Sequence, residues 1–335
     1  MNEGRRTKDE RRILSGMRPT GKLHLGHLVG ALNNWVKLQD THQCFYMVAD
    51  WHALMSEYED PKELRENIHE MVRDFIAVGL DPEKSVIFIQ SHVPEHLELA
   101  MVFGDITPLA WLERCPTYKE QLREIKGREL ATFGFLGYPV LQAADIAIYK
   151  ADAVPVGVDQ LPHLELTREI VRRFNALYKK NLFPEPEPIL TKTSKLLGID
   201  NRKMSKSYGN YIAISDPPNT IAKKVYKMVT DPKRIHVTDK GHPNVCTVHS
   251  YFAAFAESKV IEEVRVGCEK GIIGCTECKK RLAKILTEYL EPISMRRKAV
   301  SDSMVEQILA RGARKARDVA SETVLEVKQL INLTV

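Results

Sequence analysis

The sequence has no hydrophobic run that could cross a membrane, because no apolar stretch reaches the roughly 18 residues that a bilayer requires. The first twelve residues, MNEGRRTKDERR, carry charges of both signs and lack the apolar segment of a secretory signal. We therefore expect residues 1–12 to be a flexible N-terminal extension. We also expect a cytoplasmic protein that does not use a membrane as a partner.

Cysteine is scarce as well, and neither sign of charge dominates. Six cysteines in a chain without a secretory signal favour free thiols or metal ligands over disulfides. The 49 basic and 44 acidic residues leave a formal net charge of +5, which permits nucleic-acid binding without requiring it. The 335 residues contain no internal repeat, and their 44% hydrophobic and 28% charged content is typical of a globular protein with two domains.

A stretch with three glycines and two histidines, SGMRPTGKLHLGH at residues 15–27, organises the first half of the chain. It follows a short apolar start and leads into a helical pattern with one apolar face. That face consists of Leu28, Ala31, Leu32 and Trp35. Glycine lets the backbone approach a ligand closely. His24 and His27 bracket the predicted helix N-terminus, where free N–H groups and the helix dipole favour an anion such as a polyphosphate.

Two more apolar runs predict further strands of a parallel sheet. Residues 44–50 and 85–90 have the continuous apolar character of buried parallel strands. Between them, Asp60-Pro61-Lys62-Glu63 has the residues of a helix start and Gly79 those of a helix end. This order predicts a βαβ unit, in which ligands bind at the carboxyl ends of the strands. We expect residues 91–131 to be helical and polar.

The segment 132–149 is dense in apolar and small residues and carries a single acid, Asp145. One interpretation is a solvent-facing carboxylate at the start of a helix. The other is a lone acid in an apolar pocket, where a buried charge needs a hydrogen-bond donor such as an indole N–H or a phenol O–H. The segment alone leaves both interpretations open.

Residues 153–160 predict a short strand that ends in a polar turn before the next helix. Asp159 in this turn could cap the helix or bind a ribose hydroxyl, as acids after strands do in nucleotide sites. Farther along, Lys203-Met204-Ser205-Lys206-Ser207 places two lysines around a serine in a polar loop. Two mobile lysines there can follow phosphates as charge develops on them.

From about residue 215 helical patterns and basic clusters dominate. Each cluster alone fits a solvated helix face, but together they suggest contacts with a phosphate backbone. They are Lys223-Lys224, Lys279-Lys280-Arg281, Arg296-Arg297-Lys298 and Arg314-Lys315-Ala316-Arg317. We therefore divide the chain into the extension 1–12, an α/β domain 13–214 and a helical domain 215–335. The division allows the last helices of the helical domain to pack back on the α/β domain.

Four cysteines in the helical domain have the spacing C-x21-C-x6-C-x2-C. They are Cys246, Cys268, Cys275 and Cys278. Structural zinc usually uses paired C-x-x-C units, and only one close pair is present here. Four thiolates at irregular spacing also hold iron–sulfur clusters. The spacing leaves zinc and iron–sulfur open, and it favours a structural or recognition role over a catalytic one.

The histidine stretch and the lysine loop together resemble the two signature motifs of class I aminoacyl-tRNA synthetases. With ADWHAL, GYPVLQAADI and VPVGVDQ added, residues 13–333 look like a bacterial-type tryptophanyl-tRNA synthetase. The resemblance implies a Rossmann-like parallel-sheet catalytic domain, an all-α anticodon-binding domain and a homodimer. It also implies a [4Fe–4S] cluster on the four cysteines, with Zn²⁺ as the alternative, since a subset of the family carries such a set.

Site residues follow from the same resemblance. Asp145 matches the family's acceptor for the indole N–H, and the other tryptophan-site positions are Gly16, His52, Tyr138, Gln142 and Gln160. The ATP-binding positions are Arg18, Pro19, Thr20, Gly26, His27, Gly157, Val158, Asp159, Leu196, Lys203, Met204, Ser205, Lys206 and Ser207. Many members of the family have Asn where this chain has His27.

The implied reaction has two steps. The tryptophan carboxylate attacks the α-phosphorus of ATP, and the acyl group of the resulting adenylate then passes to the 3′ end of tRNA(Trp). Catalysis is positioning and electrostatic stabilisation, with Mg²⁺ on the phosphates and Lys203, Lys206, His24 and His27 as the main catalytic groups. The alternatives are a tyrosyl-tRNA synthetase and a non-catalytic, synthetase-like RNA-binding protein. The intact histidine and lysine motifs argue against the second alternative.

Overall fold

A computed structural model describes residues 11–115, 132–190, 196–206 and 208–334. Its centre is a five-stranded sheet in which every strand pair is parallel. The strands are β1 (Arg12–Met17), β2 (Gln43–Val48), β3 (Ser85–Ile89), β4 (Ala153–Val156) and β5 (Glu187–Leu190), in the spatial order β3-β2-β1-β4-β5. The strand order reverses between β1 and β4, so a ligand site is expected beyond their carboxyl ends.

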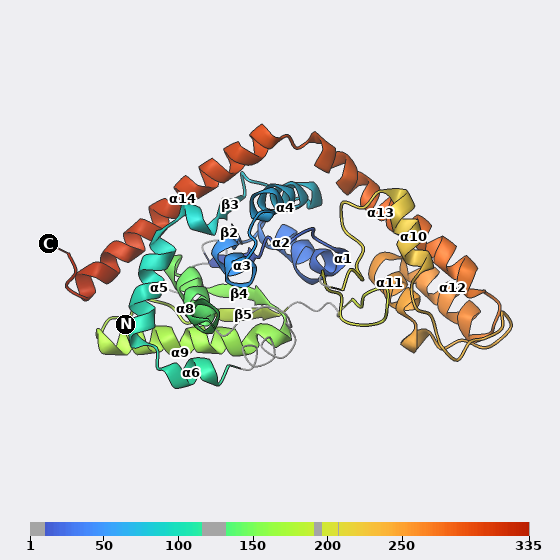
Figure 1. The fold of residues 1–335 in the computed structure, drawn as a ribbon, viewed down its shortest axis with the longest axis horizontal. Coiled ribbons are helices and arrows are strands. Elements are labelled where there is room, and N and C mark those ends of the chain that lie inside the picture. The colour runs from blue at the N-terminus through green and yellow to red at the C-terminus, as the bar shows by residue number, and fades with distance from the viewer. Residues whose placement is uncertain (1–10, 116–131, 191–195, 207, 335) are drawn as a thin grey trace.

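Helices cover both faces of this sheet (Figure 1). Strand residues alternate between two cores: Ile13, Tyr46 and Ile87 face one, and Leu14 and Phe88 face the other. The first core is closed by α1 (Leu25–His27), a π-helical turn (Leu28–Leu32), α2 (Asn33–Leu38) and α4 (Leu64–Val78). The second is closed by α5 (Glu95–Ile106), α6 (Leu109–Glu113), α8 (Phe133–Ile148) and α9 (Leu161–Leu177). The predicted α/β fold with a parallel sheet is thus confirmed.

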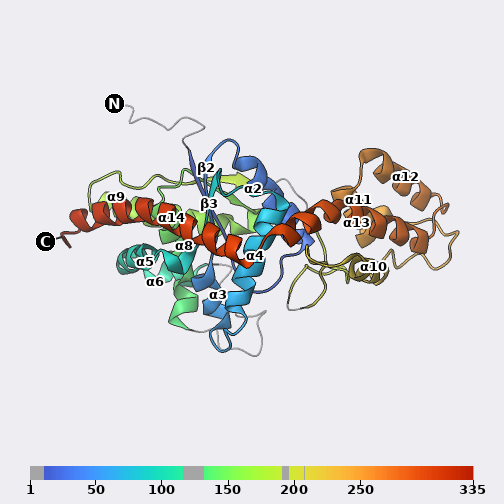
Figure 2. The same ribbon diagram turned by 90° about the horizontal axis from the view of Figure 1, so that it is seen from above.

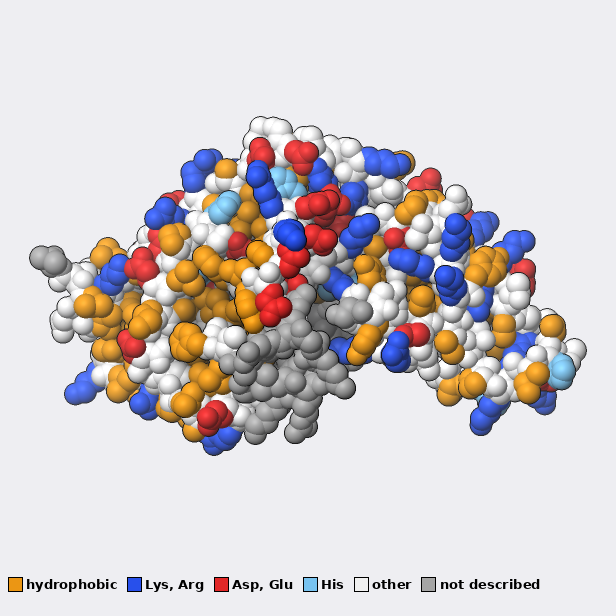
Figure 3. All heavy atoms as spheres, viewed as in Figure 1, with side chains coloured by type: hydrophobic (Ala, Val, Ile, Leu, Met, Phe, Trp, Pro, Cys, Tyr) orange, Lys and Arg blue, Asp and Glu red, His pale blue; other side chains and the backbone are white. Residues whose placement is uncertain are grey.

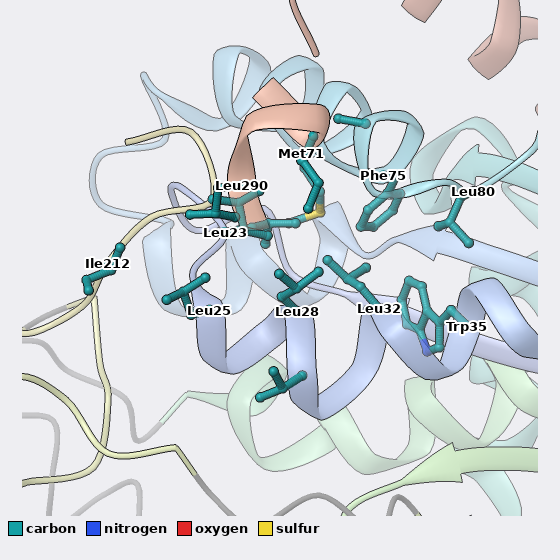
Figure 4. Close-up of a cluster of buried hydrophobic side chains, with 14 of the residues drawn as sticks. Leu23, Leu25, Leu28, Leu32, Trp35, Met71, Phe75, Leu80, Ile212 and Leu290 are labelled. Atoms are coloured by element: carbon teal, nitrogen blue, oxygen red, sulfur yellow. The ribbon is translucent and has the colours of Figure 1, made fainter. Parts of the chain in front are cut away.

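The segment after the histidine stretch differs from its predicted α-helix. Residues 28–32 form a π turn, in which Leu28 and Leu32 still point toward α4 (Figure 4). Trp35 continues this row, and its ring meets Phe75 edge-on at a centroid distance of 5.5 Å. Ala31, predicted on the same apolar face, is partly buried against the same core, and Ala31 and Trp35 both also line a cavity. The predicted apolar face therefore forms although the backbone takes a wider π turn.

The helix predicted between the second and third strands is α4, but it begins later than expected. Asp60 does not cap it, because residues 61–63 form a turn in which the Leu64 N–H donates to the Pro61 carbonyl at 3.0 Å. Its C-terminal signal is confirmed, since Gly79 ends the helix with φ of +112°. Of the predicted helical region 91–131, α5 and α6 are described, and residues 116–131 lie outside the described residues.

The second half of the chain is mainly helical. It contains α10 (Pro218–Tyr226), α11 (Thr247–Phe255), α12 (Ser258–Glu269), α13 (Cys275–Ala299) and α14 (Asp302–Leu330). The helices α10 to α12 gather at one end of the molecule, away from the sheet (Figure 1). The long α13 leads back from them, and α14 then runs along the α/β part (Figure 2). Where the structure describes the chain, it has no helix long and apolar enough to span a membrane.

Helix α14 covers the open edge of the sheet at β3. Gly312 in α14 lies so close that a Cβ on it would stand 1.8 Å from the carbonyl oxygen of Ile87. Ala316 and Ala320, one and two turns farther on, are fully buried. Small residues on this stripe therefore let a helix seal a strand whose outer backbone groups would otherwise be open to another chain.

This contact predicts opposite effects for two helical glycines. Gly312→Ala is expected to lower the free energy of unfolding by about 3 kcal/mol, the upper end for an overpacked site, because backbone has to move. Gly104→Ala in α5 is the matched control, since nothing lies within 4 Å of its added Cβ. It is expected to raise stability by about 0.5–1 kcal/mol. Urea denaturation checks both, and equal effects would contradict the close packing of α14 on β3.

Candidate active site

A cavity of about 640 Å³ opens at the carboxyl ends of β1 and β4, where the strand order reverses. This size is typical of ligand sites. It brings together residues from both halves of the predicted site: Gly16, Arg18, Thr20, His24, His27, His52, Tyr138, Gln142, Asp145, Gly157, Gln160, Lys203, Met204, Ser205 and Lys206. Pro19, Gly26, Val158, Asp159 and Leu196 are not among its lining residues, and Ser207 lies outside the described residues.

The two histidines of the signature stretch form a stacked pair, with ring centroids 3.7 Å apart. The backbone N–H of His24 donates to Nδ1 of His27 at 3.1 Å, so His27 carries its proton on Nε2. Burial, followed by the charge of Lys206, lowers the pKa of His24 to about 4. Burial also lowers the pKa of His27. Both rings are therefore neutral near pH 7 and offer N–H donors instead of positive charges.

Lys206 reaches the turn that precedes these histidines. Its Nζ donates to the carbonyl of Gly21 at 2.8 Å, and Gly21 has the left-handed φ of +110° that favours glycine. Burial, followed by repulsion from the Arg18 guanidinium, lowers the pKa of Lys206 to about 8. The ammonium group is still charged near pH 7, but it is poorly solvated and suited to an anionic ligand.

Asn210, which the sequence analysis missed, holds the lysine loop through hydrogen bonds to its backbone. The Ser205 N–H donates to its side-chain oxygen at 2.8 Å, and its amide donates to the carbonyl of Lys203 at 3.1 Å and to Asp200 at 2.7 Å. Asn210 is buried. In the sequence, the signal that could have identified Asn210 is an asparagine after a glycine, three residues beyond the lysine motif.

Asp145 lies inside α8 with 2% of its surface exposed, so the structure decides for the buried interpretation. His52 of α3 (Asp50–Glu57) contacts its Oδ2 at 2.8 Å, and His96 of α5 contacts its Oδ1 at 2.6 Å. Gln90, just after β3, donates to both oxygens at 2.8 and 2.9 Å. Burial acts to raise the pKa of Asp145, but the hydrogen bonds from His52 and His96 outweigh it and hold the pKa at about 2. Gln90 and His96 were missed by the sequence analysis.

Tyr138, whose ring centroid lies 6.4 Å from that of His52, belongs to a second chain of contacts. Its hydroxyl lies 2.8 Å from Nε2 of His163, and Nδ1 of His163 lies 3.3 Å from Sγ of Cys115. Burial lowers the pKa of His163 to about 4, so the imidazole is neutral. His163 also lines the cavity, although the sequence analysis did not select it.

Asp159 is not a helix cap. The N-cap of α9 is Gln160, and no side chain caps that helix. Asp159 instead folds back over Gly157, where an added Cβ would stand 2.7 Å from its carboxylate oxygen. The carboxylate lies in an exposed residue beside the end of β4, so the capping interpretation is wrong and the ribose interpretation stays a prediction.

The four cysteines of the helical region lie near one another but do not form a ready coordination shell. Cys246 precedes α11, Cys268 is in the last turn of α12, and Cys275 and Cys278 are in the first turn of α13. All four are half-buried free thiols. Burial and then repulsion from the other three thiolates raise the pKa of Cys278 to about 12. Within the described ranges, no three His, Cys, Asp or Glu side chains are grouped as a metal site would require.

Comparison with known proteins agrees with this geometry. Residues 6–291 match the family described as tRNA synthetases class I (W and Y), and the chain belongs to this family. It is 53% identical to the tryptophan–tRNA ligase of Thermotoga maritima, over 96% of this chain and 99% of that one. It is 45% identical to the tryptophan–tRNA ligase of Aquifex aeolicus, over 96% of this chain and all of the other. Within the family, the chain is therefore a member of the tryptophan–tRNA ligases.

A solved structure extends the likeness to three dimensions. The tryptophanyl-tRNA synthetase of Campylobacter jejuni, solved in complex with ADP and tryptophan, superimposes with a TM-score of 0.86 at 32% identity. The superposition covers 96% of this chain and 99% of that chain.

The geometry around Lys206 predicts an unusually reactive amine. In the ligand-free protein, modification of Lys206 by an amine-specific reagent should have its pH midpoint near 8, because burial and Arg18 disfavour the charged form. ATP should protect the residue. Peptide mapping by mass spectrometry measures this, with the Lys206→Arg protein as the control that lacks the amine. A midpoint near the ordinary lysine pKa of about 10.4 would contradict the burial.

Proposed function

We propose that this cavity activates L-tryptophan with ATP and transfers it to tRNA(Trp). A tryptophan carboxylate oxygen bonds to the α-phosphorus of ATP, the bond from that phosphorus to the bridging oxygen breaks, and pyrophosphate leaves. The terminal ribose hydroxyl of the tRNA then attacks the acyl carbon, and AMP leaves. The observation that carries the proposal is the pairing, in one cavity, of a buried acceptor, Asp145, with the donors Lys206, His24 and His27.

The phosphate end of the cavity is assigned to the histidine stretch and the lysine loop. His24 lines the cavity, and its buried Nδ1 has no hydrogen-bond partner in the described part of the chain. Lys206 supplies a charge, and the neutral rings supply N–H donors that need no reorganisation when charge develops. Mg²⁺ would arrive on the ATP phosphates and neutralise the leaving pyrophosphate. We further assign Lys203 to the phosphates and Asp159 to the ribose, with the other predicted ATP positions around them.

The amino-acid end is assigned to the side of the cavity that contains Asp145. Its carboxylate would accept the indole N–H, and His52 lies beside it. Tyr138, Gln142, Gln160 and Gly16 line the same cavity and would contact the rest of the substrate. A site built around a hydrogen bond rejects an analogue that lacks the donor.

Amino-acid-dependent ATP–pyrophosphate exchange with each of the twenty amino acids tests the function. Tryptophan alone should drive exchange. Exchange driven by tyrosine would support the tyrosyl-tRNA synthetase alternative instead. No exchange with any amino acid, together with retained tRNA binding, would support the non-catalytic alternative.

Replacing the acceptor should relax specificity. Asp145→Asn removes the charge and one acceptor while keeping the shape, and discrimination of tryptophan over phenylalanine should fall by about 100-fold or more from a value on the order of 10⁴. Steady-state exchange kinetics with both amino acids measure the ratio. Unchanged discrimination in a folded variant would show that Asp145 is not the indole acceptor.

For the helical region we propose the anticodon-binding role, with residues 215–335 as its domain and 13–214 as the catalytic domain. Lys223 and Lys280 are exposed there, while Arg281 is already paired with Glu263 at 2.8 Å and with Glu277. This pairing makes Arg281 a weaker candidate for phosphate contact than its neighbour Lys280.

We also propose a homodimer and a cytoplasmic location. Large apolar side chains are exposed on α5 and α6, where Leu97, Met101 and Leu109 are 41, 67 and 58% exposed. In Figure 3, hydrophobic side chains are frequent on the surface of the part of the molecule that contains these helices. Such a surface is typical of a protein interface, and a second copy of this chain is the partner that we propose for it.

Finally, we propose that Cys246, Cys268, Cys275 and Cys278 bind one [4Fe–4S] cluster, with Zn²⁺ as the alternative. The support is that Cys246, Cys268 and Cys275 lie close enough to raise the pKa of Cys278 from the ends of neighbouring helices, in a chain with two other cysteines. Small movements of these helix ends would be needed to complete the shell. Binding would release the protons of the thiols and tie α11, α12 and α13 together.

Metal analysis tests this assignment. Protein purified without oxygen should contain iron and sulfide, and Cys275→Ser should lose both while retaining pyrophosphate exchange. tRNA charging should fall in this variant, because the proposed role is in recognition. Cys44→Ala, in β2, is the control for removing a thiol elsewhere. Zinc without sulfide would select the alternative, and equal loss of exchange and charging would contradict separate roles for the two domains.

A further inference from the structure

Two residues that hold Asp145 do not line the cavity. Gln90 and His96 are both 0% exposed, and they approach the carboxylate from the side of the protein core. His52, by contrast, belongs to the cavity lining. The acceptor therefore has an inner set of donors, Gln90 and His96, that a substrate does not reach.

The inner set continues to a third residue. Nε2 of His96 lies 2.8 Å from the hydroxyl of Tyr149, which is the residue after α8 and is itself fully buried. The Tyr149 ring stacks on Phe45 at a centroid distance of 4.5 Å and meets Phe88 edge-on at 5.6 Å. These aromatic contacts fix the direction of the hydroxyl toward His96.

This chain of contacts determines the tautomer of His96. Burial raises the pKa of Tyr149 well above its ordinary value, and the nearby carboxylates of Asp145 and Glu95 raise it further, so the phenol keeps its proton. A buried hydroxyl proton needs an acceptor. Among the described residues, the recorded partner of this hydroxyl is Nε2 of His96. His96 therefore accepts at Nε2 and carries its own proton on Nδ1, which faces Oδ1 of Asp145.

The opposite tautomer of His96, protonated on Nε2, would remove the hydrogen bond to Asp145. A lone pair on Nδ1 would then stand 2.6 Å from Oδ1 of Asp145, and two acceptors would face each other between buried side chains. With Nδ1 protonated, His96 gives the carboxylate a hydrogen-bond donor from a residue outside the cavity lining. This donor helps to keep Asp145 ionised and fixes the orientation of the carboxylate.

We propose that Tyr149 and His96 are positioning residues for substrate specificity: the Tyr149 hydroxyl sets the His96 tautomer, which presents Asp145 to the indole N–H. The proposal rests on the proposed role of Asp145 as the indole acceptor. Neither residue touches the substrate, so both act through the Asp145 carboxylate alone.

The first test replaces the hydroxyl. Tyr149→Phe should lower kcat/KM for tryptophan in pyrophosphate exchange by about 10-fold, as for the loss of one hydrogen bond, mainly through KM. The low activity with phenylalanine should not change. Tyr46→Phe is the matched control, because it also removes a buried hydroxyl from the sheet region, one that donates to the carbonyl of Trp35 at 2.8 Å. An equal effect of both variants on tryptophan would overturn the proposal.

The second test replaces the ring. His96→Asn keeps an N–H near the position of Nδ1 and should retain most discrimination of tryptophan over phenylalanine. His96→Leu should lose about 10- to 100-fold, the range for a hydrogen bond to a charged group. Thermal unfolding identifies any variant that fails to fold. Equal discrimination in both folded His96 variants would overturn the proposal.

A spectroscopic readout reports on the tautomer directly. In protein labelled with ¹⁵N-histidine, His96 should be in the Nδ1–H form, and Tyr149→Phe should broaden or shift its signals. An Nε2–H form in the parent would overturn the proposal.

The variant Asp145→Asn distinguishes a failure of the proposal about Tyr149 from a failure of the proposed role of Asp145. If this variant loses discrimination and Tyr149→Phe does not, the proposal about Tyr149 is wrong and the role of Asp145 stands. If Asp145→Asn also has no effect, the proposed acceptor itself is wrong.

Discussion

A carboxylate stays charged inside a protein only where hydrogen-bond donors replace the water that it has lost. Asp145 is the place at which this chain has to meet that requirement. The donors come from α3, from the end of β3 and from α5, while the carboxylate is on α8. The helices α3, α5 and α8 and the end of β3 must therefore keep fixed relative positions. These positions determine the shape of the side of the cavity that contains Asp145.

The phosphate side shows the opposite response to burial. There the buried groups are bases, and burial removes the charge of His24 and weakens that of Lys206. The cavity thus has a charged acceptor at one end, and neutral histidine donors beside the Lys206 ammonium at the other. This separation suits a substrate that brings an N–H to one end and a polyphosphate to the other, because the fold already holds the groups of both ends in place.

The helical region is connected to the α/β domain by hydrogen bonds and by packing. Arg297, near the end of α13, donates to the buried Asp74 of α4 at 2.7 Å, and Arg296 donates to the carbonyl of Ala77 at 2.6 Å. Helix α14 then seals β3 through Gly312. The cysteine-bearing helices are therefore connected to α4, whose Met71 and Phe75 share one buried cluster with Leu23 and Leu28 (Figure 4).

The sequence by itself determined the elements and the motifs. Apolar spacing predicted the parallel strands, Gly79 marked the end of α4, and the two signature stretches identified the family, because these signals are local. It misplaced the start of α4, where turn geometry overrode capping preference, and it left the role of Asp159 open between a helix cap and a ribose contact. Only the tertiary structure decided that Gln90 and His96, 55 and 49 residues from Asp145, supply its donors. It alone also decided which histidines are neutral, because protonation depends on burial and on neighbours that the fold brings together from distant parts of the chain.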